Sequence, residues 1–255
     1  MVGPAPRLAV SVAGDGPFVL FLHGIRGNRR NWSAQLEAFS KRFKAAAWDA
    51  RGYGDSDDHP GALQFDYFSG DVLRVLEHFG VKQAHLVGVS MGGRIARNVA
   101  IRWPEWIKSL TLVSTSPGFD AMPPDEVRRF VTERRTPPTP ESVRRLLGSR
   151  ARPGAFEALW ESVRAVRDEP YRKTLEASVA QDRGALLENI RLPTLVVSGD
   201  EDTVYPPEMA RDVARRIPGA QLAMIEGGGH LLNLEQPEPF NKAVMDFINQ
   251  NQKSK

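Results

Sequence analysis

The sequence predicts an α/β fold in which a mostly parallel sheet is flanked by helices and interrupted by an inserted helical segment. Short apolar runs alternate with segments of helical periodicity, which is the pattern of parallel strands joined by crossover helices. Several runs are apolar at every position, as expected for strands that are buried on both faces. The alternation stops after Thr115 and resumes only near Thr194, so an insertion separates two parts of the sheet.

The expected strands and their covering helices follow in chain order. Strands are predicted at residues 7–14, 18–24, 45–50, 84–90, 109–115, 194–200 and 220–227. Apolar residues at helical spacing then mark three helices that cover the sheet, and these residues are Tyr67, Phe68, Val72, Val75, Leu76 and Phe79, then Met209, Val213 and Ile217, then Phe240, Val244, Phe247 and Ile248.

We expect residues 1–118 and 191–255 to form the core and residues 119–190 to form a helical cap, or lid. The insertion begins with Pro-rich turns and then shows two amphipathic helices, one marked by Phe156, Leu159, Trp160 and Val163 and one by Tyr171, Leu175 and Val179. It contains 12 Arg and one Lys against 12 Asp and Glu, so it is rich in arginine but nearly neutral. Most of these charges are expected to face solvent.

Composition excludes several classes of protein. Hydrophobic residues make up 41% and charged residues 25% of the 255 positions, which is the balance of a globular protein rather than a disordered one. A net charge of only +3 gives no support to nucleic-acid binding. With no cysteine in the chain, thiol nucleophiles, disulfides and cysteine-bound metals are excluded.

The chain shows neither a secretory signal pattern nor an apolar run approaching the ~18 residues of a membrane span. We therefore expect a cytoplasmic protein that acts on a small molecule and has no nucleic-acid or membrane partner. The sequence leaves the oligomeric state open.

Ser90 is the candidate nucleophile. It lies in GVSMGGR (88–94), between an apolar run and a helical segment, where Gly88 and Gly92 leave room for a sharp strand-to-helix turn. Such a turn exposes the serine and directs the backbone N–H of Met91 into the same site, where it can stabilise an oxyanion.

A serine hydroxyl needs a base within hydrogen-bond reach and an acid that orients the base. Of the five histidines, His230 alone is expected at the carboxyl end of a later strand, in the glycine-rich loop of IEGGGH. The segment GDEDTVYPP (199–207) offers Asp200, Glu201 and Asp202 as the acid. Asp202 lies beyond the strand end and is the preferred candidate, while Asp200 is expected to brace the turn.

The second oxyanion donor is expected after an early strand, in FLHGIRGN, where the backbone N–H of Ile25 follows His23 and Gly24. His23 itself is expected to bond local backbone. Arg26 and Trp160 are the candidate substrate-binding residues. Arg26, Arg29 and Arg30 would either bind an anionic substrate or lie in solvent.

Five ordered motifs give the chain a resemblance to the α/β-hydrolase fold family. They are FLHG, DARGYGDSD (49–57), GVSMGG, GDEDTVYPP and EGGGHLLNLEQPEPF (226–240). The chain is similar to the capped group that contains 3-oxoadipate enol-lactonases, cofactor-free haloperoxidases, carboxylesterases and carbon–carbon bond hydrolases, over residues 7 to 249. The order Ser, Asp, His is the one that this fold uses.

This resemblance implies a cofactor-independent serine hydrolase, without a metal, that cleaves a small ester or enol-lactone through an acyl-enzyme. One alternative is hydrolysis of a carbon–carbon bond in a vinylogous diketone, which uses the same three residues. An alternative of another class is a ligand receptor with a retained triad. Fold alone does not decide among these activities.

Overall fold

A seven-stranded sheet forms the centre of the molecule. The computed structural model describes residues 1–119, 122–181 and 186–252. In these ranges the strand order is β1-β3-β2-β4-β5-β6-β7, with β1 antiparallel to β3 and every other neighbouring pair parallel. The strands are β1 (Val10–Ala13), β2 (Phe18–Leu22), β3 (Lys44–Trp48), β4 (Ala84–Val89), β5 (Ile107–Val113), β6 (Thr194–Gly199) and β7 (Gln221–Ile225).

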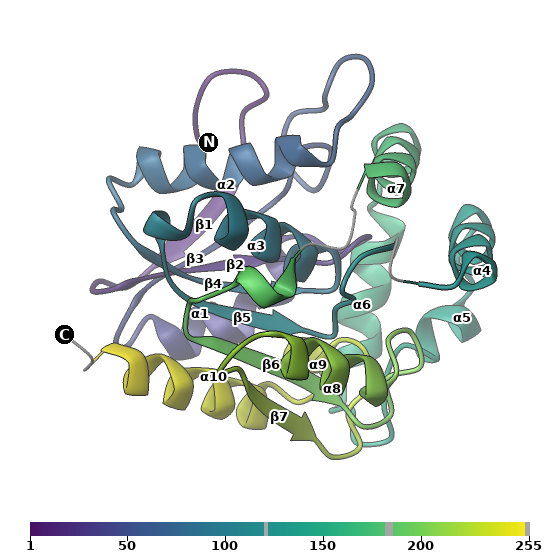
Figure 1. Cartoon of the computed structure of the whole chain (residues 1–255). Coiled ribbons are helices and arrows are strands. Elements are labelled where there is room, and N and C mark those ends of the chain that lie inside the picture. Colours follow the sequence, from purple (N-terminus) through teal and green to yellow (C-terminus); the bar gives the residue numbers. More distant parts are fainter. Residues whose placement is uncertain (120–121, 182–185, 253–255) are drawn as a thin grey trace.

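Helices cover both faces of this sheet (Figure 1). Those of the core are α1 (Ser33–Phe39), α2 (Asp66–His78), α3 (Met91–Arg102), α8 (Pro207–Arg216), α9 (Leu232–Glu235) and α10 (Pro237–Gln252), with short 3₁₀ turns at Arg29–Trp32 and Pro104–Trp106. The 3₁₀ turn at Leu187–Asn189 lies in the segment between β5 and β6. The predicted mostly parallel sheet flanked by helices is therefore confirmed, and each of the seven predicted strands is present.

Two apolar layers hold the helices on the sheet. On one face α2, α3 and α8 pack through residues such as Val72, Ile95 and Val213. On the other face α1 and α10 pack through residues such as Phe39 and Phe240. Strands β2, β4 and β6 are buried at every position, because side chains of both faces meet helices.

The segment between β5 and β6, which we call the helical insertion (residues 119–190), carries four helices among its described residues. These are α4 (Pro124–Arg135), α5 (Pro140–Arg144), α6 (Ala155–Arg164) and α7 (Asp168–Gln181). The sequence predicts α6 and α7, whereas α4 and α5 lie where Pro-rich turns dominated the pattern. Helix α4 buries only Phe130, so its apolar periodicity is too weak to identify it from sequence.

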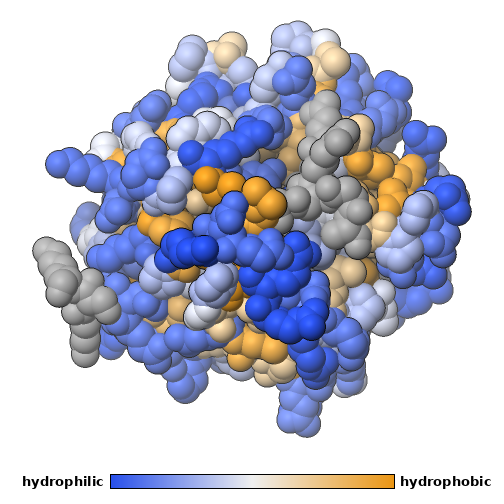
Figure 2. Space-filling model, viewed as in Figure 1, coloured by the Kyte–Doolittle hydropathy of each residue, from blue (hydrophilic) through white to orange (hydrophobic). Residues whose placement is uncertain are grey.

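The insertion lies to one side of the sheet, with α7 and α4 on the right in Figure 1. Figure 2 shows a mainly hydrophilic surface on this face of the molecule, with several separate apolar patches, one of them in the region of α7 and α4. Within the described ranges, no helix has the length and apolar character needed to cross a bilayer.

Candidate active site at the carboxyl ends of the strands

Three candidate residues follow three parallel strands at the same edge of the sheet. Ser90 comes directly after β4, Asp202 three residues after β6, and His230 five residues after β7. Because parallel strands end at a common edge, the fold brings these loops together. All three residues are nearly covered, with exposed fractions of 7%, 3% and 6%, respectively.

Ser90 occupies a strained turn between β4 and α3. Its φ of 54° and ψ of −114° are unusual for a residue with a side chain. A side chain on Gly88 would collide with the Gly92 carbonyl, and one on Gly92 with the Leu22 carbonyl, so both positions require glycine. The backbone of Ser90 donates to Val113 O at 2.8 Å, and its carbonyl accepts from Thr115 Oγ1 at 2.8 Å. These bonds hold the strained conformation in place.

His230 and Asp202 are directly hydrogen-bonded. His230 Nδ1 lies 2.9 Å from Asp202 Oδ2, and Asp202 Oδ1 accepts from the backbone N–H groups of Val204 at 2.8 Å and Tyr205 at 3.0 Å. Burial by itself raises the pKa of Asp202, but the bonds to His230 and to the two N–H groups outweigh it and hold this pKa below its usual value. Asp202 is therefore ionised at neutral pH and can orient the imidazole.

Asp200 has a different neighbourhood. Its Oδ1 accepts from the backbone N–H of Gly227 at 2.7 Å, in the loop that leaves β7. Glu201 accepts from the backbone N–H of Ser149 at 2.6 Å and from its hydroxyl at 2.7 Å. Of the three candidate acids, Asp202 is the one that lies against His230.

No hydrogen bond joins Ser90 to His230 among the described residues. Only Nδ1 of His230 has a side-chain partner there, so Nε2 is available to a reacting group. Catalytic hydrogen bonds are often long without substrate and tighten when it binds.

Sequence reasoning missed Glu235, a fully buried carboxylate at the end of α9, the short helix that follows His230. Its Oε2 accepts from Gly229 N at 2.8 Å and Gly148 N at 2.7 Å, and its Oε1 from Leu231 N at 2.7 Å. Burial raises the pKa of Glu235, an effect that the three N–H groups oppose. Glu235 thus fixes both residues that flank His230. The available signal was an acid in the mostly apolar stretch LLNLE.

The loop after β2 lies against the Ser90 turn. A β carbon placed on Gly24 would be 3.2 Å from Ser90 Cβ and 3.8 Å from its Oγ. Among the described residues, the backbone N–H groups of Ile25 and Met91 have no acceptor. Met91 is the first residue of α3, where N–H groups have no partner within the helix. Two unused donors near Ser90 are what an oxyanion site requires.

His23 holds this loop in place. Its Nε2 accepts from Ala50 N at 3.0 Å, so Nδ1 carries the proton and donates to Gly24 O at 2.8 Å. Burial lowers the pKa of His23, which keeps the ring neutral.

The three loop arginines have different partners. Arg26 donates from Nη2 to Arg134 O at 2.8 Å, and its guanidinium lies 4.5 Å from the ring centre of Tyr171 in α7. Arg29 forms ion pairs with Asp49 and Asp55. The Arg30 side chain is 80% exposed. Arg26 is therefore the one that reaches the helical insertion.

An apolar cluster lies between the helical insertion and the loops of the site. Phe119, Phe130, Leu175 and Tyr205 form its buried part, and Ile25 packs against it. The ring centre of Tyr205 is 5.6 Å from that of His230. The cluster thus reaches the edge of the His230–Asp202 pair.

Trp160 belongs to a second cluster in the insertion. It stacks on Phe156 in α6, with ring centres 6.2 Å apart and an interplanar angle of 10°. Leu231, the residue after His230, packs against the same cluster. Trp160 is thus linked to the His230 loop through packing.

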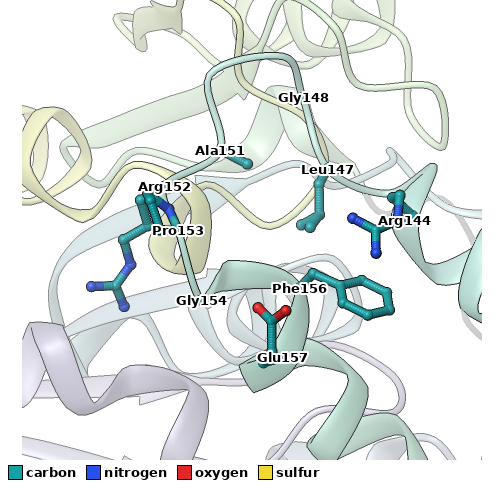
Figure 3. Close-up of a pocket in the computed structure, with 9 residues that line it drawn as sticks. All are labelled: Arg144, Leu147, Gly148, Ala151, Arg152, Pro153, Gly154, Phe156 and Glu157. Atoms are coloured by element: carbon teal, nitrogen blue, oxygen red, sulfur yellow. The ribbon is translucent and has the colours of Figure 1, made fainter.

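The pocket in Figure 3 is a separate feature, with a volume of about 400 Å³. It is lined by residues of the segment 144–157, including Arg144, Phe156 and Glu157, and by none of the three candidate catalytic residues. In the part of the chain that the structure describes, no group of three or more His, Cys, Asp or Glu side chains could hold a metal ion.

Comparisons with known proteins concern the family and the fold of the chain. The chain is 27% identical over 238 residues to 3-oxoadipate enol-lactonase 2 of Acinetobacter baylyi, covering 90% of this chain and 88% of the relative. It is 26% identical to a Pseudomonas savastanoi pv. phaseolicola protein that carries the name of a carbamate hydrolase, with 92% and 95% coverage.

Among solved structures, a malate-bound thermophilic esterase from Thermogutta terrifontis superposes with a TM-score of 0.83 at 29% identity, covering 98% of this chain and 97% of the esterase. The family model of the alpha/beta hydrolase fold matches residues 17–237, so the chain belongs to the alpha/beta hydrolase family.

Proposed function

We propose that this protein is a serine hydrolase that cleaves a small ester or lactone through an acyl-enzyme, with Ser90 as nucleophile, His230 as base and Asp202 as the orienting acid. The observation that carries the proposal is the hydrogen bond between His230 Nδ1 and Asp202 Oδ2, beside a serine held in a strained turn. Esterase and lactonase relatives support the same reaction class.

In the first half-reaction His230 Nε2 takes the proton of Ser90 Oγ as that oxygen bonds to the substrate carbonyl carbon. The negative charge that develops on the carbonyl oxygen is stabilised by the N–H groups of Ile25 and Met91. The bond to the leaving oxygen then breaks, and His230 gives that oxygen the proton.

In the second half-reaction water loses a proton to His230 Nε2 and attacks the acyl carbon. Ser90 Oγ leaves, recovers the proton and releases the carboxylic acid. Asp202 stays ionised throughout, because its pKa is below the usual value, and it stabilises the imidazolium formed in each half.

The helical insertion acts in this proposal as a cap. Ser90 and His230 are almost inaccessible, and the apolar cluster of the insertion lies next to them. A cap that covers the site excludes water from the oxyanion and selects the acyl group.

The test is a pair of proteins, the wild type and Ser90→Ala, assayed on a small ester, a lactone and a vinylogous diketone. We expect Ser90→Ala to lower turnover by at least about 10⁴-fold, since triad members act as a unit. A fluorophosphonate should label Ser90 in the wild type alone. Labelling of another residue, or preferred turnover of the diketone, would contradict the proposal.

A further inference from the structure

Arg134 lies in the last turn of α4 and contacts an apolar cluster, although most charged residues of this helix face solvent. Its guanidinium lies 3.5 Å from the ring centre of Phe130, in the apolar cluster beside the candidate site. In the described ranges, Arg134 forms no ion pair with a carboxylate. The hydrogen bond that its guanidinium makes there runs from Nη1 to Phe130 O at 3.5 Å, the limit of a useful contact.

The Arg134 side chain is half-buried, and the face of the Phe130 ring stabilises its charge without a carboxylate partner among the described residues. Burial lowers the pKa of this guanidinium, while Tyr205, Tyr171 and the carboxylate of the neighbouring Glu133 act in the opposite direction. An arginine nevertheless keeps its proton in proteins, so the cation remains in a largely apolar setting. Such a charge is costly unless an anion pairs with it.

Tyr205 supplies a second, independent observation. The residue is 2% exposed, yet its hydroxyl has no hydrogen-bond partner among the described residues. Buried hydroxyls normally have a hydrogen-bond partner, because an unpaired hydroxyl loses its hydrogen bonds to water and gains none in the protein. The Tyr205 ring also lies beside His230, so a group bound to its hydroxyl would be close to the reacting atoms.

The backbone of Arg134 is fixed from two sides. Its carbonyl accepts from Arg26 Nη2 at 2.8 Å and from Tyr171 Oη at 2.9 Å. Arg26 directly follows Ile25, the candidate oxyanion donor, so Arg134 is held in a defined position relative to the oxyanion loop. Arg26 also adds positive charge to the region.

We propose that Arg134 and Tyr205 bind a carboxylate carried by the acyl part of the substrate. The inference rests on the proposed ester or lactone hydrolysis and specifies its substrate class. A guanidinium donates two parallel N–H bonds to a carboxylate, and the tyrosine hydroxyl donates a third. Phe119, Phe130 and Leu175 of the same apolar cluster would contact the aliphatic chain that separates this carboxylate from the scissile carbonyl.

The test uses two matched substrates, the mono-4-nitrophenyl ester of adipic acid and the methyl ester of the same compound. The measured quantity is the ratio of kcat/KM for the anionic substrate to kcat/KM for the neutral one. We expect Arg134→Gln to lower this ratio about ten- to hundredfold, since a bidentate charged pair is lost. Tyr205→Phe, which removes one neutral donor, should lower it about three- to tenfold.

Arg135→Gln is the matched control, because Arg135 is the next residue of α4 and is exposed. Its ratio should equal that of the wild type. The proposal fails if Arg134→Gln leaves the ratio unchanged, or if Arg135→Gln lowers it equally. Fluorophosphonate labelling of Ser90 at the wild-type rate in Arg134→Gln would show that the variant is folded around the site.

A binding measurement separates this inference from the proposed reaction. Adipate titrated into Ser90→Ala should bind, and Arg134→Gln in that background should weaken the affinity at least about tenfold. Equal affinities, or no binding to Ser90→Ala, would overturn the carboxylate site. If the wild type hydrolyses neither ester and Ser90 is not labelled, the reaction is wrong, while the titration still decides whether Arg134 binds a carboxylate.

Discussion

The loops at the sheet edge and the helical insertion place their functional groups by different means. At the sheet edge, backbone hydrogen bonds and buried carboxylates fix each candidate residue, as with Ser90 N on Val113 O and Glu235 on Gly229 N. In the insertion, α4 buries only Phe130 and presents most of its charged side chains to solvent. In the proposed reaction, the chemistry therefore depends on groups held by the sheet edge, whereas substrate selection depends on a few side chains of the insertion.

The largest expected effect comes from changing the acid at the sheet edge. Asp202→Asn should lower kcat by about 10⁴-fold, because the imidazolium loses its charge partner and His230 its tautomer. Asp200→Asn removes a carboxylate that bonds only to Gly227 N among the described residues and should cost far less. Equal losses of kcat in steady-state ester hydrolysis would show that the hydrogen bond to His230 does not decide which carboxylate acts as the orienting acid.

A smaller effect is expected at Glu235, where the sheet edge meets the insertion. Glu235→Gln replaces one acceptor oxygen by a donor that cannot serve a backbone N–H, so at least one buried N–H is left unpaired. We expect kcat/KM to fall about ten- to hundredfold, which corresponds to the ~1 to 3 kcal/mol of an unpaired group.

Glu226→Gln is the control for Glu235→Gln, because Glu226 is 72% exposed and pairs at the surface with Arg150. Its activity should remain near that of the wild type. A Glu235→Gln protein with normal kcat but a lowered melting temperature would show that the carboxylate stabilises the loop without positioning His230.

The stabilising contribution of the Asp202 carboxylate should depend on pH. The pKa of Asp202 is lowered in the folded state, so its stabilising contribution is complete above the usual value of 3.8 and is lost as pH falls through the folded pKa. The free energy of unfolding of the wild type relative to Asp202→Asn should therefore be largest near neutral pH and shrink in strong acid. Urea unfolding at a series of pH values measures it, and a difference that grows toward acid would contradict the lowered pKa.

The smallest effect concerns the strain at Ser90. Glycine adopts a positive φ without steric cost, so Ser90→Gly should be more stable than Ser90→Ala by about 0.5 to 2 kcal/mol. Calorimetry of the two inactive variants gives this difference directly. Equal melting temperatures would mean that the turn stores little strain.

The sheet and the candidate triad were predictable because each depends on local sequence patterns. Strands such as Ala84–Val89 are continuous apolar runs, and Ser90 and His230 each lie in a glycine-rich turn next to a strand. Helix α4 was not predicted, since a single buried phenylalanine gives no periodicity.

The possible roles of Glu235, Tyr205 and Arg134 could not be predicted for another reason. Each depends on contacts between distant segments, such as Gly148 with Glu235 or Arg26 with Arg134. Neither composition nor spacing reports such contacts. Arg26 was identified in the sequence as a possible substrate ligand, but its bond to the Arg134 carbonyl required the fold.

The bonds between residues 146–152 and the His230 loop limit which parts of the insertion can be exchanged between relatives. His230 N donates to Leu146 O, Arg150 N to Gly227 O, and Arg152 N to Glu235 O, in addition to Gly148 N on the Glu235 carboxylate. A chimera that replaces the whole insertion would remove all four bonds. Recombination that retains 146–152 and exchanges only α4 and α7 would keep His230 in place, so new substrate ranges can be sought in this way.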